Sequence, residues 1–154
     1  MDERAQNQGI REHLWQHLES EHRQLDKVLG DVESLAADGS FETAKKRFGE
    51  YRLAHERHLI RERKLEALYR EIRETASFVT RLQRERTRML EQAERVWASL
   101  CQEKNAQVPR MLERLTTLVA QHEDAQRRLI LADLPLSPER RREQAELLRQ
   151  LGSS

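Results

Sequence analysis

The chain has 154 residues, of which 36 % are charged and only 5 % aromatic, with five glycines and three prolines. This composition is typical of a highly helical, well-solvated domain, and the regular recurrence of Leu, Val and Ile argues against disorder. The net charge of +1 comes from interleaved acidic and basic residues, so we expect no nucleic-acid binding; short arginine-rich clusters such as RERTR (84–88) leave it only as a distant third option.

The first predicted helix runs from about Ile10 to Ala37 and follows a flexible N-terminus at residues 1–9. Gly39 is suited to the left-handed cap that ends such a helix. Steps of three and four residues give the helix a core-facing stripe, which comprises Leu14, Leu18, His22, Leu25, Leu29 and Val32.

The second predicted helix begins near Phe41 and continues past Tyr69. No Gly or Pro occurs between Gly49 and Pro109, so the only plausible break is ETAS (74–77). We favour this break over one very long helix, because long coiled coils keep polar residues rare on the seam.

Two further long helices and a short one follow. The third has the stripe Phe78, Leu82, Met89, Ala93, Val96 and Leu100. The fourth has the stripe Val108, Met111, Leu115, Leu118, His122, Gln126 and Leu129. A short helix after Ser137 carries Leu147, Leu148 and Leu151. The sequence therefore predicts an all-α, up-down antiparallel four-helix bundle over residues 10–133, followed by a short additional C-terminal helix and tail at 134–154.

Each long helix interrupts its stripe once with polar residues. The gaps hold, in chain order, His22, then His55, His58 and Glu62, then Glu85 and Arg86, then His122 and Gln126. In an antiparallel bundle, residues at equal distances from a connecting turn lie at the same height, and these gaps lie at similar distances from the two expected turns. We therefore expect them to meet at one level of the core.

A buried carboxylate at that level needs a compensating positive charge, since desolvating it costs several kcal/mol. Iron, zinc and manganese suit a set of neutral imidazoles and a carboxylate. His58 and Glu62 are one helical turn apart, so both can reach one ion.

These segments resemble the hemerythrin-like (HHE) four-helix bundles. LESEHRQLDKVL (18–29), HLIRERKLEALY (58–69) and LVAQHEDAQRRLIL (118–131) are similar to the motifs of that family's first, second and fourth helices. The resemblance implies metal ligands at His22, His58, Glu62 and His122. Family members hold a di-iron centre that binds oxygen, using five histidines and two bridging carboxylates. Here Arg86 stands in the place of the third-helix histidine and Gln126 in that of the fourth-helix carboxylate.

Two readings of this reduced set stay open. In the first, His22, His58, Glu62 and His122 hold a single iron or zinc ion, Glu85 replaces the missing bridging carboxylate, and the resemblance implies a role in sensing or handling iron or oxygen. In the second, the core is metal-free, the Arg86 guanidinium pairs with Glu62, and the protein is a regulatory or interaction module. Neither reading makes it an enzyme.

The remaining features point to packing or surface positions. We expect His13 and His17 at the surface, His55 beside the ligands or at the rim of the layer, and Cys101 as a small buried thiol. One cysteine excludes an internal disulfide. The N-terminus lacks the apolar run of a secretion signal, and no stretch approaches the length of a membrane span, so we expect a cytoplasmic protein without membrane partners. A homo-oligomer or a protein partner stays open.

Overall fold

The computed structural model describes residues 3–70, 72–73, 75–132 and 136–152, with the side chains of all of these except 3, 151 and 152. Within these ranges there is no strand, which confirms the all-α class. The helices are α1 (Glu3–Ala37), α2 (Phe41–Arg70), α3 (Ala76–Cys101), α4 (Val108–Leu131) and α5 (Pro138–Gly152), with a 3-10 turn, η1, at Asn105–Gln107. No helix among the described residues is both long and apolar enough to cross a lipid bilayer.

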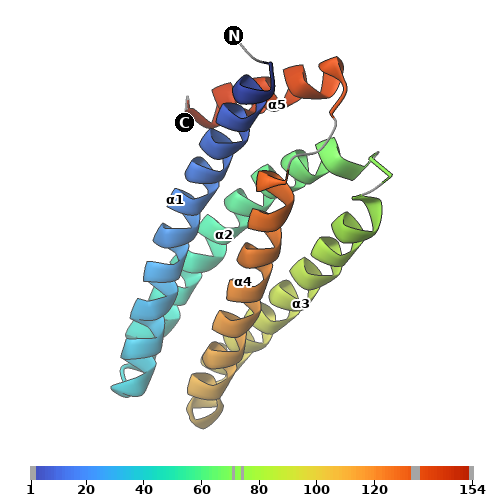
Figure 1. Cartoon of the computed structure of the whole chain (residues 1–154). Coiled ribbons are helices and arrows are strands. Elements are labelled where there is room, and N and C mark those ends of the chain that lie inside the picture. Colours follow the sequence, from blue (N-terminus) through green and yellow to red (C-terminus); the bar gives the residue numbers. More distant parts are fainter. Residues whose placement is uncertain (1–2, 71, 74, 133–135, 153–154) are drawn as a thin grey trace.

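The four long helices pack side by side. α1 packs against α2 and α4, and α3 packs against the same two helices. The α1–α2 turn and the α3–α4 connection lie at one end of the molecule, and α5 lies across the other end, where it contacts α1 and α2 (Figure 1). The C-terminal helix thus packs on the other helices.

The first turn forms as its sequence predicts. Gly39 has a φ of 78°, and the backbone N–H of Ser40 donates to the carbonyl of Leu35 across it. This arrangement ends α1 and starts α2 within three residues, because glycine enters the left-handed region without steric cost.

The break between α2 and α3 falls at the predicted place, although its first position, residue 74, lies outside the described residues. Thr75 plays a different part from the cap that its type suggests. Its hydroxyl donates to the carbonyl oxygens of Tyr69, at 2.7 Å, and of Ile72, at 3.2 Å, and not to the first amides of α3. It therefore satisfies backbone acceptors at the end of α2.

Three details correct the sequence analysis. α1 begins at Glu3 and not at Ile10, because α5 packs against α1. The core face of α4 runs through Leu112 and Val119, one residue later than the predicted Met111 and Leu118, which are half-buried. Cys101 is exposed and not buried, because the stripe of α3 ends at Leu100.

The apolar core is divided into two clusters. One contains Leu25 and Phe48, near the end with the two connections, and the other contains Leu18 and Leu65, near α5. On every long helix the two clusters are separated by the polar gap. The polar residues therefore form a layer between two apolar regions, and this layer is the candidate functional site.

Candidate metal centre

The layer brings together residues from all four long helices, at the one level that the sequence predicts. His22 of α1, His58 and Glu62 of α2, Arg86 of α3 and His122 of α4 are each no more than 4 % exposed. Helical spacing explains this, because each residue continues the core-facing stripe of its own helix.

Three of the predicted ligands lie close enough to share one ion. Ligand atoms of His22, His58 and Glu62 all lie within 4.8 Å of one another. The rings of His22 and His58 meet edge to face, with their centroids 4.6 Å apart. His58 Nε2 lies 3.5 Å from Glu62 Oε1.

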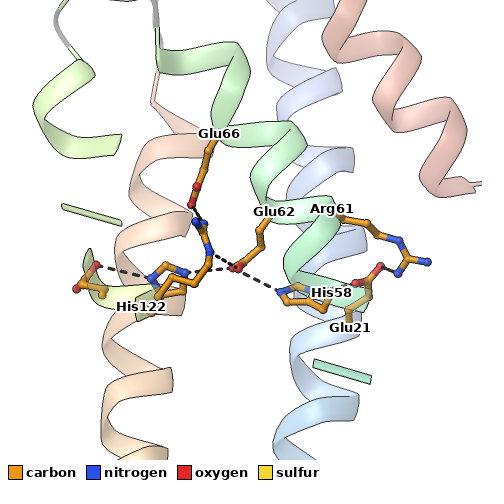
Figure 2. Close-up of polar contacts among 8 residues, drawn as sticks. Glu21, His58, Arg61, Glu62, Glu66 and His122 are labelled. Carbon is orange, nitrogen blue, oxygen red and sulfur yellow. Dashed lines mark hydrogen bonds and ion pairs between the residues drawn. The ribbon is translucent and has the colours of Figure 1, made fainter. Parts of the chain in front are cut away.

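His122 approaches the same carboxylate from the opposite side, as Figure 2 shows. Its Nε2 atom lies 3.2 Å from Glu62 Oε1. Glu85, by contrast, lies beside the other ring nitrogen, with Oε1 3.8 Å from His122 Nδ1. Glu85 is thus a neighbour of His122, and the three-residue group above does not include it.

Arg86 reaches into the layer but pairs mainly with a residue that the sequence analysis missed. Its NH2 group donates to Glu66 in a short, buried contact, whereas its Nε lies 3.6 Å from Glu62 Oε2. The expected Glu62–Arg86 pair is therefore the weaker of two contacts. Glu66 lies one helical turn after Glu62 on α2, and this spacing is the sequence feature that could have identified it.

A second carboxylate orients His58. His58 Nδ1 lies 2.7 Å from Glu21 Oε2, and Arg61 donates to the other oxygen of Glu21 at 2.5 Å (Figure 2). When Nδ1 carries a proton and donates it to Glu21, Nε2 keeps its lone pair on the side of Glu62. Carboxylate–histidine pairs of this kind fix the ring of a metal ligand and raise its basicity.

Many polar atoms of the layer lack a hydrogen-bond partner. Among the described residues, every buried side-chain nitrogen or oxygen without such a partner belongs to this layer or its immediate neighbours. These atoms belong to His22, Tyr51, His58, Glu62, Glu66, Glu85, Arg86, His122 and Gln126. Buried polar atoms are normally paired, so their concentration at one level indicates a site that accepts an ion or water.

The electrostatic environment differs among the proposed ligands: at pH 7 it favours a neutral imidazole at His22, an ionised carboxylate at Glu62 and a protonated ring at His58. Burial, with the nearby His58, lowers the pKa of His22 to about 4, so its imidazole is neutral at pH 7. Burial acts to raise the pKa of Glu62, but the adjacent imidazoles of His122 and His58 hold it well below its usual range. Burial acts to lower the pKa of His58, but the hydrogen bond to Glu21 and the nearby carboxylate of Glu62 raise it to about 9.

His55 lies beside the layer and is not part of the three-residue group. It is buried and stacks on Tyr51, with ring centroids 5.2 Å apart. Burial lowers the pKa of His55 to about 4. His13 and His17, which we expected at the surface, are exposed.

Comparison with known proteins gives no relative for this chain: no family model, no curated protein and no solved structure matches it. Three imidazoles and one carboxylate in a buried layer are a donor set that suits zinc or iron.

Proposed function

We propose that the protein binds a single metal ion, zinc or iron, in the middle of its helical core. The ligands are His22, His58 and Glu62, with His122 as the fourth. The supporting observation is that ligand atoms of these three buried residues from α1 and α2 lie within 4.8 Å of one another. Each of the three residues also has a buried side-chain atom without a hydrogen-bond partner. Zinc would tie the helices together, and iron with an open coordination position would also accept a small ligand.

The same proposal includes a fold type: an up-down antiparallel four-helix bundle similar to the hemerythrin-like proteins. Two features support it. The two short connections lie at one end of the molecule, and each long helix packs against two neighbours. The residues at the matched motif positions, His22, His58, Glu62 and His122, also come from three helices into one layer. A role in sensing or handling iron or oxygen follows from this resemblance.

Glu85 and Arg86 have supporting roles in this proposal. Glu85 lies beside the outer nitrogen of His122 and can orient that ring, so it is not counted as a ligand. Arg86 faces Glu66 more closely than Glu62. The positive charge of the guanidinium thus lies mainly against Glu66, which is not one of the proposed ligands.

The alternative is a metal-free layer in a regulatory or protein-interaction module. Its support is that the layer contains its own positive charges. Arg86 contacts both Glu62 and Glu66. The hydrogen bond of His58 to Glu21, together with the nearby Glu62 carboxylate, raises the pKa of His58 to about 9 against the effect of burial. A protonated His58 would compensate Glu62 without a metal.

Elemental analysis distinguishes the metal-binding proposal from the metal-free alternative. Protein from cells grown with added iron and zinc, purified without chelator, should carry one metal ion per chain. Glu62→Gln should lose the ion, because an amide oxygen is a weaker ligand than a carboxylate. The matched control is Glu56→Gln, which makes the same change at an exposed position of the same helix. A wild-type protein that stays metal-free, and takes up neither Zn²⁺ nor Fe²⁺ after treatment with chelator, contradicts the proposal.

A further inference from the structure

A cavity of about 240 Å³ opens between α1 and α4, directly beside the candidate metal centre. His22 belongs to both, because its imidazole lines the cavity and also supplies a ligand atom to the group with His58 and Glu62. One side of the buried layer is therefore next to the groove between α1 and α4 that contains this cavity.

The charged lining of this cavity is mainly acidic. Four carboxyl groups and two guanidinium groups face it. Because burial and the negative charge of Asp26 raise the pKa of Glu123 to about 8, the lining carries one negative charge more than positive ones at pH 7. One guanidinium, that of Arg23, already pairs with a lining carboxylate, Glu19, at 3.2 Å. The charged residues are Glu19, Arg23, Asp26, Glu123, Asp124 and Arg127.

Two of these carboxylates contact each other across the groove. The carboxyl group of Asp26 on α1 is hydrogen-bonded to that of Glu123 on α4, and this contact holds one proton between them at pH 7. Two carboxyl groups in contact need a positive charge between them, which a proton or a metal cation can supply. Asp26 lies one helical turn after His22, and Glu123 follows His122 in the chain, so the pair lies next to two of the proposed ligands.

His22 connects this groove to the core layer. Its side chain is 4 % exposed and its Nε2 atom has no hydrogen-bond partner. The ring is therefore an unpartnered donor in the wall between the cavity and the core. Trp15 also lines the cavity and meets the His22 ring edge to face, with centroids 5.7 Å apart.

A second groove that reaches the polar layer has different chemistry. It lies between α2 and α3 and is lined by His55, with two arginines and two glutamates that balance in charge. It also carries the exposed apolar side chains of Leu53 and Ile60. A cation gains no net attraction there.

We propose that the α1–α4 groove is the route by which a divalent cation reaches the core, and that Asp26 and Glu123 form an outer cation site on that route. This inference rests on the proposed metal-binding function. Glu123 is next to His122 in the chain, and Asp26 is one helical turn from His22, so a cation held between the two carboxylates lies close to both proposed ligands. It then passes from oxygen ligands at the surface to nitrogen ligands in the core.

Trp15 allows the route to be tested by kinetics. In a Trp97→Phe background, Trp15 is the single tryptophan, and Co²⁺ bound at His22 should quench its fluorescence. Chelator-treated protein is mixed rapidly with CoCl₂ and the association rate is measured. The double variant Asp26→Asn/Glu123→Gln should bind Co²⁺ about tenfold more slowly than the parent, because acidic lining concentrates cations at a cleft.

The matched control removes two carboxyl groups from the groove between α2 and α3, as Glu56→Gln/Glu94→Gln, and should associate at the parent rate. Circular dichroism shows that each variant is folded. A parent that takes up no Co²⁺ contradicts the metal-binding function itself. A parent that binds Co²⁺ with an association rate unchanged in the double variant overturns the route alone. Complete loss of binding in a folded double variant also overturns it, because the carboxylates would then be ligands of the core ion.

Discussion

Glu21 on α1 and His58 on α2 are joined across the helix interface by a hydrogen bond of 2.7 Å between Oε2 and Nδ1. In the neutral ring, this contact determines which ring nitrogen of His58 is free, because a proton on Nδ1 leaves Nε2 as the acceptor. It also connects the core layer to the surface, since Arg61 holds the second oxygen of Glu21. The orientation of the proposed ligand is thus set by residues outside the ligand set.

Removal of this contact should weaken metal binding without removing a ligand. Glu21→Ala is expected to lower the affinity for Zn²⁺ about 10- to 100-fold, as for other carboxylates that orient a metal-bound histidine. Competition with a coloured chelator measures the change. Glu21→Gln should have a smaller effect because its amide oxygen still accepts from Nδ1. Unchanged affinity in Glu21→Ala would show that the hydrogen bond does not orient His58.

The Arg86–Glu66 pair should matter for stability more than an exposed pair does. Glu66→Gln leaves a buried guanidinium without its closest partner and should reduce the free energy of unfolding by about 3–5 kcal/mol. Denaturant unfolding in the presence of EDTA measures this in the metal-free protein. Because both charges then leave the core, the double variant Glu66→Leu/Arg86→Met should recover most of the loss.

The control for this prediction is the exposed pair between Arg128 and Asp124, whose side chains are 75 % and 55 % exposed. Arg128→Gln should change the free energy of unfolding by less than about 1 kcal/mol, as is usual for surface pairs. If Glu66→Gln has an equally small effect, Arg86 does not depend on Glu66 in the folded state.

The sequence was sufficient to predict the polar layer because periodicity reports burial. His22, His58, Glu62 and His122 each continue an apolar stripe, and an ionisable residue on such a stripe must be buried with partners. The expected antiparallel arrangement then predicts that the four interruptions lie at one height. The contacts of Glu62 with His58 and His122 confirm that these segments converge.

Periodicity was not sufficient to identify the partners of these residues. Glu66 lies four residues after Glu62, but the predicted stripe stepped by three to Leu65, and both positions are buried. Glu21 is half-buried beside the stripe, so no pattern singled it out. Which carboxylate Arg86 meets depends on the direction of a long, flexible side chain, and this is set by packing between α2 and α3.

The connection between α3 and α4 offers a stabilising substitution. Glu103 has a φ of 56°, and the N–H of Lys104 donates to the carbonyl of Ser99 across it, as in the cap at Gly39. A residue with a side chain costs about 1–2 kcal/mol in this left-handed conformation. Glu103→Gly removes this cost, but part of the gain is lost because glycine gives up more conformational entropy on folding. The variant should raise the free energy of unfolding by up to about 1 kcal/mol. Gly39→Ala, at a φ of 78°, should lower it by a similar amount.

Alkaline pH should weaken the contact between α5 and the rest of the fold. Tyr69 is fully buried, and the Gln144 amide of α5 donates to its hydroxyl at 3.1 Å. Burial raises the pKa of Tyr69 to about 12, above the unfolded value near 10. A raised pKa means that the folded state favours the neutral phenol. The stabilisation is therefore complete below pH 10 and is lost as pH rises to 12, by about 2–3 kcal/mol.

Urea unfolding between pH 8 and pH 12 measures this loss, and tyrosinate absorbance should rise together with unfolding. Tyr69→Phe is the matched variant. It should be less stable at pH 8, because the buried Gln144 amide loses its acceptor at a cost of about 1–3 kcal/mol. Its free energy of unfolding should then fall less steeply above pH 10 than that of the wild type. Buried Tyr51 contributes the same background to both proteins, because burial raises its pKa as well. Equal slopes for the two proteins would show that ionisation of Tyr69 is not coupled to unfolding.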